Sequence, residues 1–346
     1  MALATRLRTY PYTYLRTILM KKKLLDRADY DKILKMSPDE IAKFIEEFEY
    51  KEEVDSLAMD YQGVELVERA LQKNLGKNFG KLLRISSPDL KKLIIVYQRR
   101  YDVYNVKTIL RAKFSGLSAD EARLHLNPVS VEPKALFEKL LTQNSVEEIA
   151  SATPFLSEAD IRAGLDYFKS NNSLVALENA LDKYYFKYVI SQLPYLIHQG
   201  KLYKNFLMQE IDVINLKLLL RLKSEKAPDQ TVKDLIFAYG MLKKDFIDRL
   251  LKSDVQSILK ELESTYFKDV VTDITKEKLN FTDIELKLVA FLQKKANKLI
   301  RQSPLSVDTI IGYMFLKDIE VKNLSRITKA KQLGLSEEFI EKTIVI

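Results

Sequence analysis

Short polar side chains recur inside three otherwise apolar segments of the chain. Each segment places a carboxylate three residues before an asparagine; the pairs are Asp102 and Asn105, Asp212 and Asn215, and Glu320 and Asn323. Residues three apart lie on one face of a helix, and a buried polar group without a hydrogen-bond partner costs about 1–3 kcal/mol. We therefore expect these six side chains to be hydrogen-bonded structural anchors, so that replacing them with alanine lowers stability.

Two basic side chains follow each of the first two pairs. Lys107 and Arg111 follow the first pair, and Lys217 and Arg221 follow the second, four residues apart in each case. Like charges at this helical spacing repel each other by a few tenths of a kcal/mol, so we expect acidic groups to face them. Those acidic groups belong either to this chain or to a partner.

The three segments come at a near-constant spacing. Their asparagines are 110 and 108 residues apart, and Ser37, Ser145 and Ser253 are 108 residues apart in turn. Such a period indicates internal repeats. A third landmark, a glutamate at positions 68, 178 and, more loosely, 285, keeps nearly the same spacing.

The serines indicate helix starts. In Ser37-Pro38-Asp39-Glu40 the serine can accept from unpaired backbone N–H groups, the proline suits the first helical position, and the glutamate completes a capping box. Ser145 repeats the pattern with Glu148, and Ser253 is the corresponding cap in the third repeat. We predict a capped helix at each place.

Two further helices complete each repeat. Apolar residues four apart predict a buried stripe on a helix through 177–189; they are Leu177, Leu181, Tyr185 and Val189. The interleaved aromatics Tyr184, Phe186 and Tyr188 predict packing on a second side. The helix through 212–223 is apolar nearly all round, so we expect it to be central in its unit.

Together these landmarks predict an all-α fold of three tandem homologous helical domains, 1–113, 114–223 and 224–346. Each runs capped helix, long helix, then the helix with the carboxylate and asparagine. A fainter copy at 14–19 echoes 105–110, so related helices both open and close the series. A closed, pseudo-threefold or funnel-like body is the simplest arrangement, with an open solenoid as the alternative.

Composition supports a helical protein that does not span a membrane. The 346 residues include only 9 Gly and 9 Pro, and no Cys. No apolar stretch approaches the roughly 20 residues that cross a bilayer, and residues 1–8 lack the core of a signal peptide. The net charge of +8 favours acidic partners. Its densest cluster, Lys21 to Lys23 with Arg16 and Arg27 nearby, is either a solvated helix face or a contact with a partner or lipid head groups.

No catalytic arrangement is visible. His125 and His198 are the only histidines, and neither has a metal-ligating neighbour at helical spacing. Gly76 and Gly80 do not form a phosphate-binding loop, and the acidic pair Glu46 and Glu47 points to different sides of its helix. We expect neither enzymatic activity nor a cofactor, a metal site or a small-molecule substrate.

The repeated motif resembles a known family. Asp-x-x-Asn-Leu/Val-Lys-x-x-Leu-Arg, together with Tyr12-Thr-Tyr14-Leu-Arg16 running into Met20-Lys-Lys-Lys-Leu24-Leu25, is similar to the C subunit of archaeal-type (A-type) ATP synthases and to the C and d subunits of V-type ATPases. The likeness covers essentially the whole chain. The third copy departs from it, with Glu320 for Asp, Ser325 for Lys and Lys329 for Arg.

The resemblance implies a non-catalytic adaptor at the cytoplasmic face of the cell membrane. Its funnel would receive the central stalk in a depression and rest on the membrane rotor ring, transmitting torque for ATP synthesis coupled to proton or sodium transport. Under this interpretation the basic stripe of Lys107, Arg111, Lys217 and Arg221 is the candidate contact with the stalk subunits, and nucleic acid is not a partner.

The main alternative is a basic helical-repeat protein that binds nucleic acid. It would explain the repeats and the charge together, and it predicts an affinity that falls steeply with salt. The 48 acidic residues that offset 56 basic ones argue against it, as does the spread of Lys and Arg over many helix faces.

Overall fold

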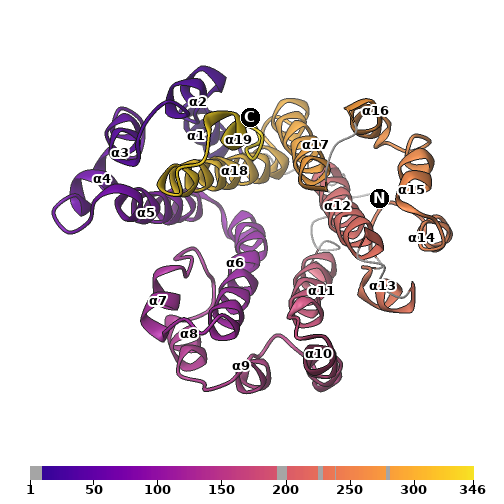
Figure 1. The fold of residues 1–346 in the computed structure, drawn as a ribbon. Helices are drawn as coiled ribbons and strands as arrows, with labels where there is room; N and C mark the ends of the chain where they lie inside the picture. The colour runs from indigo at the N-terminus through magenta and orange to yellow at the C-terminus, as the bar shows by residue number, and fades with distance from the viewer. Residues whose placement is uncertain (1–9, 193–200, 225–228, 238, 278–280) are drawn as a thin grey trace, which may run out of the picture. The chain divides into compact units, whose positions relative to one another are not determined.

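Every regular element of the described chain is an α-helix (Figure 1). The computed structural model describes residues 10–192, 201–224, 229–237, 239–277 and 281–346. The all-α prediction is confirmed. The chain forms helices because it contains few of the glycines and prolines that interrupt them. No described helix is both long enough and apolar enough to cross a membrane.

The chain divides into two compact units. The continuous unit is Ser87–Ile197, and the discontinuous unit joins Met1–Ser86 to His198–Ile346. The predicted division into three tandem domains, 1–113, 114–223 and 224–346, and their funnel-like arrangement stay predictions.

The continuous unit is built around its longest helix, α6. Its helices are α6 (Pro88–Phe114), α7 (Ala119–Leu124), α8 (Lys134–Leu141), α9 (Val146–Ala152), α10 (Glu158–Asn171) and α11 (Val175–Gln192). Helix α6 packs against α7, α8, α9 and α11, all of which follow it in the chain. The stripe predicted on α11 is confirmed, because Leu177, Leu181, Tyr185 and Val189 are all buried.

The discontinuous unit begins with five helices and continues with eight more among its described residues. The first are α1 (Pro11–Lys21), α2 (Arg27–Ile33), α3 (Pro38–Glu46), α4 (Lys51–Leu57) and α5 (Gly63–Ile85). The later ones are α12 (Lys201–Ser224), α13 (Asp229–Leu235), α14 (Lys244–Leu250), α15 (Val255–Leu262), α16 (Lys268–Glu277), α17 (Phe281–Gln302), α18 (Val307–Gln332) and α19 (Glu337–Glu341).

Helix α18 is the centre of the discontinuous unit. It packs against α17 and α12 from the later part of the chain and against α1, α3 and α5 from the first part. Residues 307–321 are buried without interruption. A helix that is buried all round must satisfy any polar side chain it carries, and this requirement shapes the site described below.

Two of the three predicted serine caps are confirmed. Ser37 caps α3, and its side chain and that of Glu40 form a complete capping box. Ser145 caps α9 and accepts from the Glu148 N–H at 3.1 Å. Because the Glu148 side chain accepts from the Asn144 N–H instead, this second cap lacks the reciprocal bond.

The prediction for Ser253 is wrong. Asp254, one residue later, caps α15 and accepts from the Ser257 N–H at 2.8 Å. The Ser253 hydroxyl donates to the Arg249 carbonyl at 3.2 Å, within the end of the preceding helix. Aspartate and serine cap helices about equally well, so residue type alone does not distinguish between two adjacent candidates.

Candidate functional site

The three repeated asparagines make the same pair of hydrogen bonds. All three are buried, with no more than 2% of their surface exposed. In each case Nδ2 donates to the carbonyl, and Oδ1 accepts from the N–H, of the residue 22 positions later; the pairs are Asn105 with Asn127, Asn215 with Phe237, and Asn323 with Val345. The distances lie between 2.5 and 3.1 Å.

The partner residue lies at the same place each time. It follows the short helix α7, α13 or α19 that comes after each long helix. One amide therefore satisfies both polar backbone groups of a buried residue that is not in a helix. We call each such arrangement an asparagine clamp.

The two aspartates bind the next stretch of the same connection. Asp102 Oδ1 accepts from the Val131 and Glu132 N–H groups at 2.7 and 3.0 Å, just before α8. Asp212 Oδ2 accepts from residues 241 and 242 at 2.6 and 3.0 Å, just before α14. Each aspartate thus satisfies unpaired N–H groups ahead of a helix start.

Asp212 also lies very close to the backbone at Gly240. A Cβ atom at this position would lie 1.8 Å from Asp212 Oδ1. The Tyr266 hydroxyl also donates to Asp212 Oδ2, at 2.5 Å. The connection can approach the carboxylate this closely because residue 240 has no side chain.

The third copy uses Glu320 in place of aspartate and takes its backbone donor from the first part of the chain. Glu320 Oε2 accepts from the Leu25 N–H at 2.7 Å, although the two residues are 295 positions apart. Leu25 precedes α2 as Val131 precedes α8. Glu320, which replaces the aspartate of the other two motifs, therefore makes a contact between distant segments of the discontinuous unit.

Lys317 neutralises the carboxylates around Glu320. It has no exposed surface, and its Nζ forms ion pairs with Glu49 and, at 2.8 Å, with Glu320 Oε1. The Tyr50 ring lies beneath the ammonium, with its centroid 4.2 Å away. Burial and the Glu320 charge raise the pKa of Tyr50 well above its ordinary value, so its hydroxyl stays protonated and donates to Glu320 at 2.6 Å.

Ion pairs line the long helices beside these anchors. Each joins a basic residue of a long helix to a carboxylate of another helix in the same unit: Lys107 to Asp182 at 2.5 Å, Arg111 to Glu178 at 2.6 and 2.7 Å, Lys217 to Glu285 at 3.3 Å, and Lys329 to Glu68 at 2.9 Å. The glutamates at 68, 178 and 285 are the third repeat landmark. The sequence predicts these positions as a landmark but does not show that each pairs with a basic residue of a long helix.

Among the predicted stalk-contact residues, Lys107, Arg111 and Lys217 therefore face carboxylates of their own unit. Arg221 is exposed on α12. Contact of this stripe with a stalk stays a prediction. Of the two histidines, His125 is exposed at the end of α7, and His198 lies outside the described residues.

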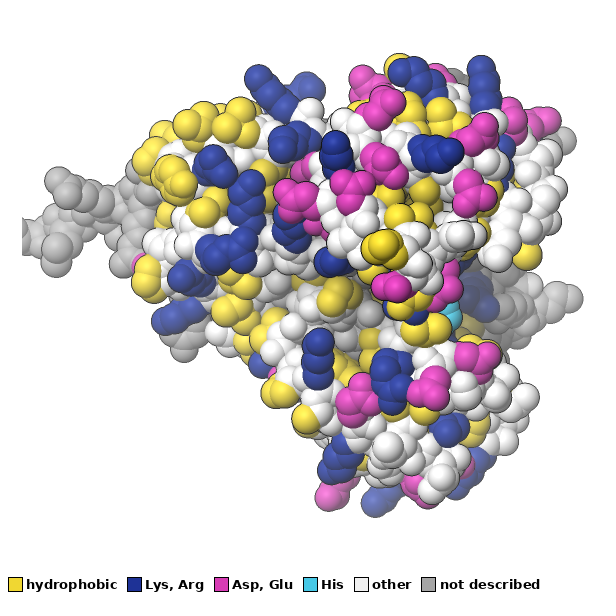
Figure 2. Space-filling view, turned by 90° about the vertical axis from the view of Figure 1, so that its left-hand side faces the viewer, with side chains coloured by type: hydrophobic (Ala, Val, Ile, Leu, Met, Phe, Trp, Pro, Cys, Tyr) yellow, Lys and Arg dark blue, Asp and Glu magenta, His cyan; other side chains and the backbone are white. Residues whose placement is uncertain are grey.

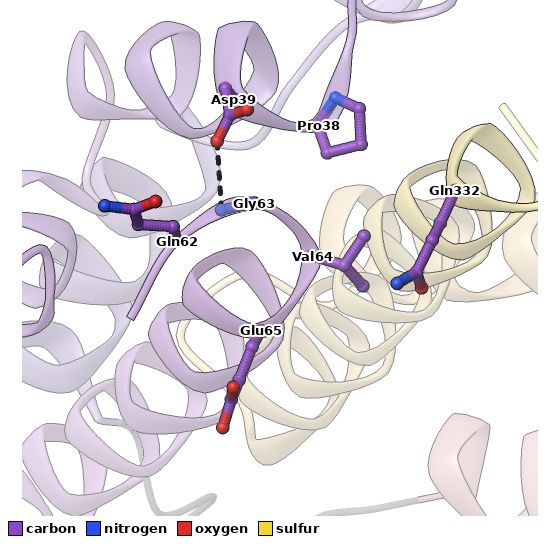
Figure 3. A pocket seen from close by; sticks show the side chains of 7 residues that line it. All are labelled: Pro38, Asp39, Gln62, Gly63, Val64, Glu65 and Gln332. Atoms are coloured by element: carbon purple, nitrogen blue, oxygen red, sulfur yellow. Dashed lines mark hydrogen bonds between the residues drawn. The ribbon is translucent and has the colours of Figure 1, made fainter. Parts of the chain in front are cut away.

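A shallow depression lies where the starts of α3 and α5 meet the end of α18 (Figure 3). It has two carboxylates in its lining. Asp39 accepts from the Gly63 N–H at 3.0 Å, and Glu65 pairs with Arg69 at 2.8 Å. Because each carboxylate is engaged and the two do not converge, the depression lacks the geometry of an acid–base pair.

Sequence reasoning missed the network around Lys317. The available signal was a single lysine within a long apolar run, Ile310 to Val321, which must be paired if the run is buried. Its partners Glu49 and Tyr50 lie more than 260 positions away, so spacing alone could not identify them.

Removing an asparagine clamp should destabilise the protein. Asn105→Ala and Asn215→Ala each leave a buried N–H and a buried carbonyl unpaired, so we expect the free energy of unfolding to fall by about 1–3 kcal/mol. Urea unfolding measures this change. Asn144→Ala, at an exposed asparagine, serves as the control; equal stability of all three variants and the parent would refute the anchoring role.

Asp102 should make stability depend on pH. Burial raises its pKa to about 6, so the folded state holds this proton more tightly than the unfolded chain does. Its contribution to stability should therefore decrease as pH rises from about 4 to about 6. We expect the difference in unfolding free energy between the parent and Asp102→Asn to fall by about 1–3 kcal/mol across that range. Urea titrations at several pH values test this, and a constant or rising difference would contradict it.

Removing the buried ammonium should cost more than removing an exposed one. Lys317→Met leaves two buried carboxylates without their counter-charge, with an expected loss of about 3–5 kcal/mol. Lys342→Met, which breaks an ion pair between two exposed side chains, Lys342 and Glu338, should cost less than about 1 kcal/mol. Adding Glu320→Gln to Lys317→Met should restore part of the loss. Similar melting curves for the two single variants would be evidence against the network.

Comparisons with known proteins agree with the resemblance. The family model described as ATP synthase (C/AC39) subunit matches residues 16–343. The C subunit of the A-type ATP synthase of Methanococcoides burtonii is 35% identical over 97% of this chain and 94% of its own length. That of Methanosarcina acetivorans is 34% identical over 97% and 93%, and that of Haloferax volcanii is 30% identical over 97% of both. The chain belongs to the ATP synthase (C/AC39) subunit family.

Proposed function

We propose that this chain is a non-catalytic rotor adaptor of a rotary A-type ATP synthase. It links the central stalk to the membrane rotor ring and transmits torque for ATP synthesis coupled to the transport of protons or sodium ions. It lies at the cytoplasmic face of the cell membrane as a peripheral subunit. The observation that carries this proposal is the family match over residues 16–343.

The anchors give the proposal a mechanical basis. An element that passes torque between two partners must resist bending at the connections between its helices. In both units, buried side chains hold the segment after a long helix at two points, as Asn105 and Asp102 do. The three-domain funnel, with a depression for the stalk and a wide face toward the ring, remains part of this proposal.

The basic stripe supplies a candidate surface for the stalk. The Arg111 side chain remains 58% exposed although it pairs with Glu178. A guanidinium has five donors, and one carboxylate uses only two of them. Acidic residues of a stalk helix could therefore bind the outer side of Arg111, with Lys217 and the exposed Arg221 acting in the same way in the other unit.

A bridging assay tests the adaptor role. Purified chain is mixed with the central-stalk subunits and with vesicles that carry the rotor ring, and the vesicles are then floated. We expect stalk subunits to float with ring-bearing vesicles only when the chain is present. Binding of the chain to duplex DNA is measured in parallel over a series of salt concentrations. Salt-sensitive DNA binding without bridging would contradict the adaptor role and favour the nucleic-acid alternative.

A charge swap tests the stripe separately from folding. Arg111→Glu combined with Glu178→Arg keeps the internal ion pair but reverses the charge at the exposed position. If the stripe contacts the stalk, the swapped protein should keep its melting temperature and lose about tenfold or more in stalk affinity, as expected for a reversed charge at an interface. Unchanged affinity would confine Arg111 to a structural role.

A further inference from the structure

Helix α1 turns its apolar side outward. Tyr12, Leu15 and Leu19 lie along one side of this 11-residue helix and are 60%, 56% and 46% exposed. The opposite side, which packs against α5 and α18, carries two threonines. This is the reverse of the usual surface helix, whose apolar stripe faces the core.

Hydrogen bonds fix this orientation. The Thr13 hydroxyl donates to the Ile85 carbonyl of α5 at 2.9 Å, and the Tyr10 N–H, just before α1, donates to the Leu305 carbonyl at 2.8 Å. Met20 is also buried on this side. Rotating the helix to bury its leucines would expose these contacts, so the outward stripe is a stable feature of the fold. We call Tyr12, Leu15 and Leu19 the α1 stripe.

Unpaired positive charge borders the α1 stripe. Residues 10–25 include Arg16 and Lys21 to Lys23 and contain no aspartate or glutamate. None of these four cations forms an ion pair within the described part of the chain. They differ in this respect from Lys107, Arg111 and Lys217, which face carboxylates.

Cations from other helices add to this group. Burial and then the neighbouring charge of Arg301 lower the pKa of Lys21. Burial followed by the charges of Arg16 and Lys23 lowers the pKa of Lys81 on α5. Figure 2 shows hydrophobic and basic side chains mingled at its upper left, where acidic side chains are few.

We propose that the α1 stripe and its basic border form a contact surface for an anionic lipid bilayer. The tyrosine and leucine side chains would enter the boundary between head groups and acyl chains, while the lysines reach lipid phosphates. Apolar residues on one side of a helix with Lys and Arg beside them are the features by which short helices bind such interfaces. The inference goes beyond the adaptor role and is argued from α1 and the cations around it.

The chemistry of this face favours lipid over a protein partner. The threonines face inward, so the outward side offers apolar surface and mobile positive charge but few directional hydrogen-bonding groups. A specific protein partner is usually held by directional polar contacts around its apolar centre. A bilayer surface requires only apolarity and opposite charge, and long lysine side chains adapt to it.

Vesicle flotation of the full chain tests the proposal. The vesicles contain phosphatidylcholine alone or an equimolar mixture with phosphatidylglycerol, and they carry no protein. We expect binding to the anionic vesicles only, weakening as salt rises. Lys22→Glu with Lys23→Glu should reduce binding about tenfold or more, since basic residues near an anionic surface each contribute to the attraction. Leu15→Ser with Leu19→Ser should reduce it to a similar extent.

Matched variants control for charge and apolarity. Lys91→Glu with Lys92→Glu reverses two exposed lysines of α6, and Leu124→Ser with Leu333→Ser changes two exposed leucines elsewhere. Both control proteins should bind vesicles like the parent. All variants should keep their melting temperature, because the substituted side chains are exposed or half exposed.

Three results would overturn the proposal. One is the absence of binding to protein-free anionic vesicles. Another is equal loss of binding in the α1 and control variants. The third is that the α1 variants reduce binding only to vesicles that carry the rotor ring, which would make the stripe a protein interface. Stalk affinity, as in the charge-swap experiment, is measured without vesicles, so failure of lipid binding and failure of stalk binding can be told apart.

Discussion

Buried side chains of the long helices form hydrogen bonds with backbone groups of the connections, which have no partner within a helix. The segment between α7 and α8 shows the constraint most clearly. Asn127 and Val129 in this connection are buried, and its polar groups bond to Asn105 and Asp102 of α6. Each bond contributes only about 0.5–1.5 kcal/mol, but leaving such groups unpaired costs more. The course of the connection, and hence the position of α8, follows from two side chains three residues apart.

The same constraint explains why the third copy differs. The backbone donor for Glu320 is Leu25, and the surrounding groups come from α18 and from the link between α3 and α4. A longer carboxylate also reaches the Tyr50 hydroxyl, and a second carboxylate, Glu49, lies close by. Lys317 supplies the positive charge that makes this burial tolerable. The third copy therefore joins the first and last segments of the discontinuous unit as well as holding a connection.

Much of this could be predicted from the sequence because it is local or periodic. Helix content, the stripe on α11 and the Ser37 cap follow from residue type and spacing. The spacing of Asp102 and Asn105 indicated that both need partners. The partners themselves are backbone groups 22 to 30 positions away, which carry no residue-type signal.

Long-range pairing escaped prediction for a different reason. Glu178 was recognised as a repeat landmark, but only the packing of α11 on α6 places it beside Arg111. The predicted Ser253 cap is wrong because two good capping residues, Ser253 and Asp254, are adjacent in the sequence. The spacing of apolar residues in α1 does not predict that its apolar side faces solvent. The same spacing is expected whether that side faces the core or the solvent.

Native-state hydrogen exchange tests most directly whether these side chains hold the connections. The amides of Asn127, Phe237 and Val345 lie outside helices and donate to asparagine side chains. If the clamps hold the connections, these amides should exchange as slowly as those in the middle of α6 and α18. Exchange at the rate of exposed loop amides would show that the clamps open freely and do not hold the helices in place.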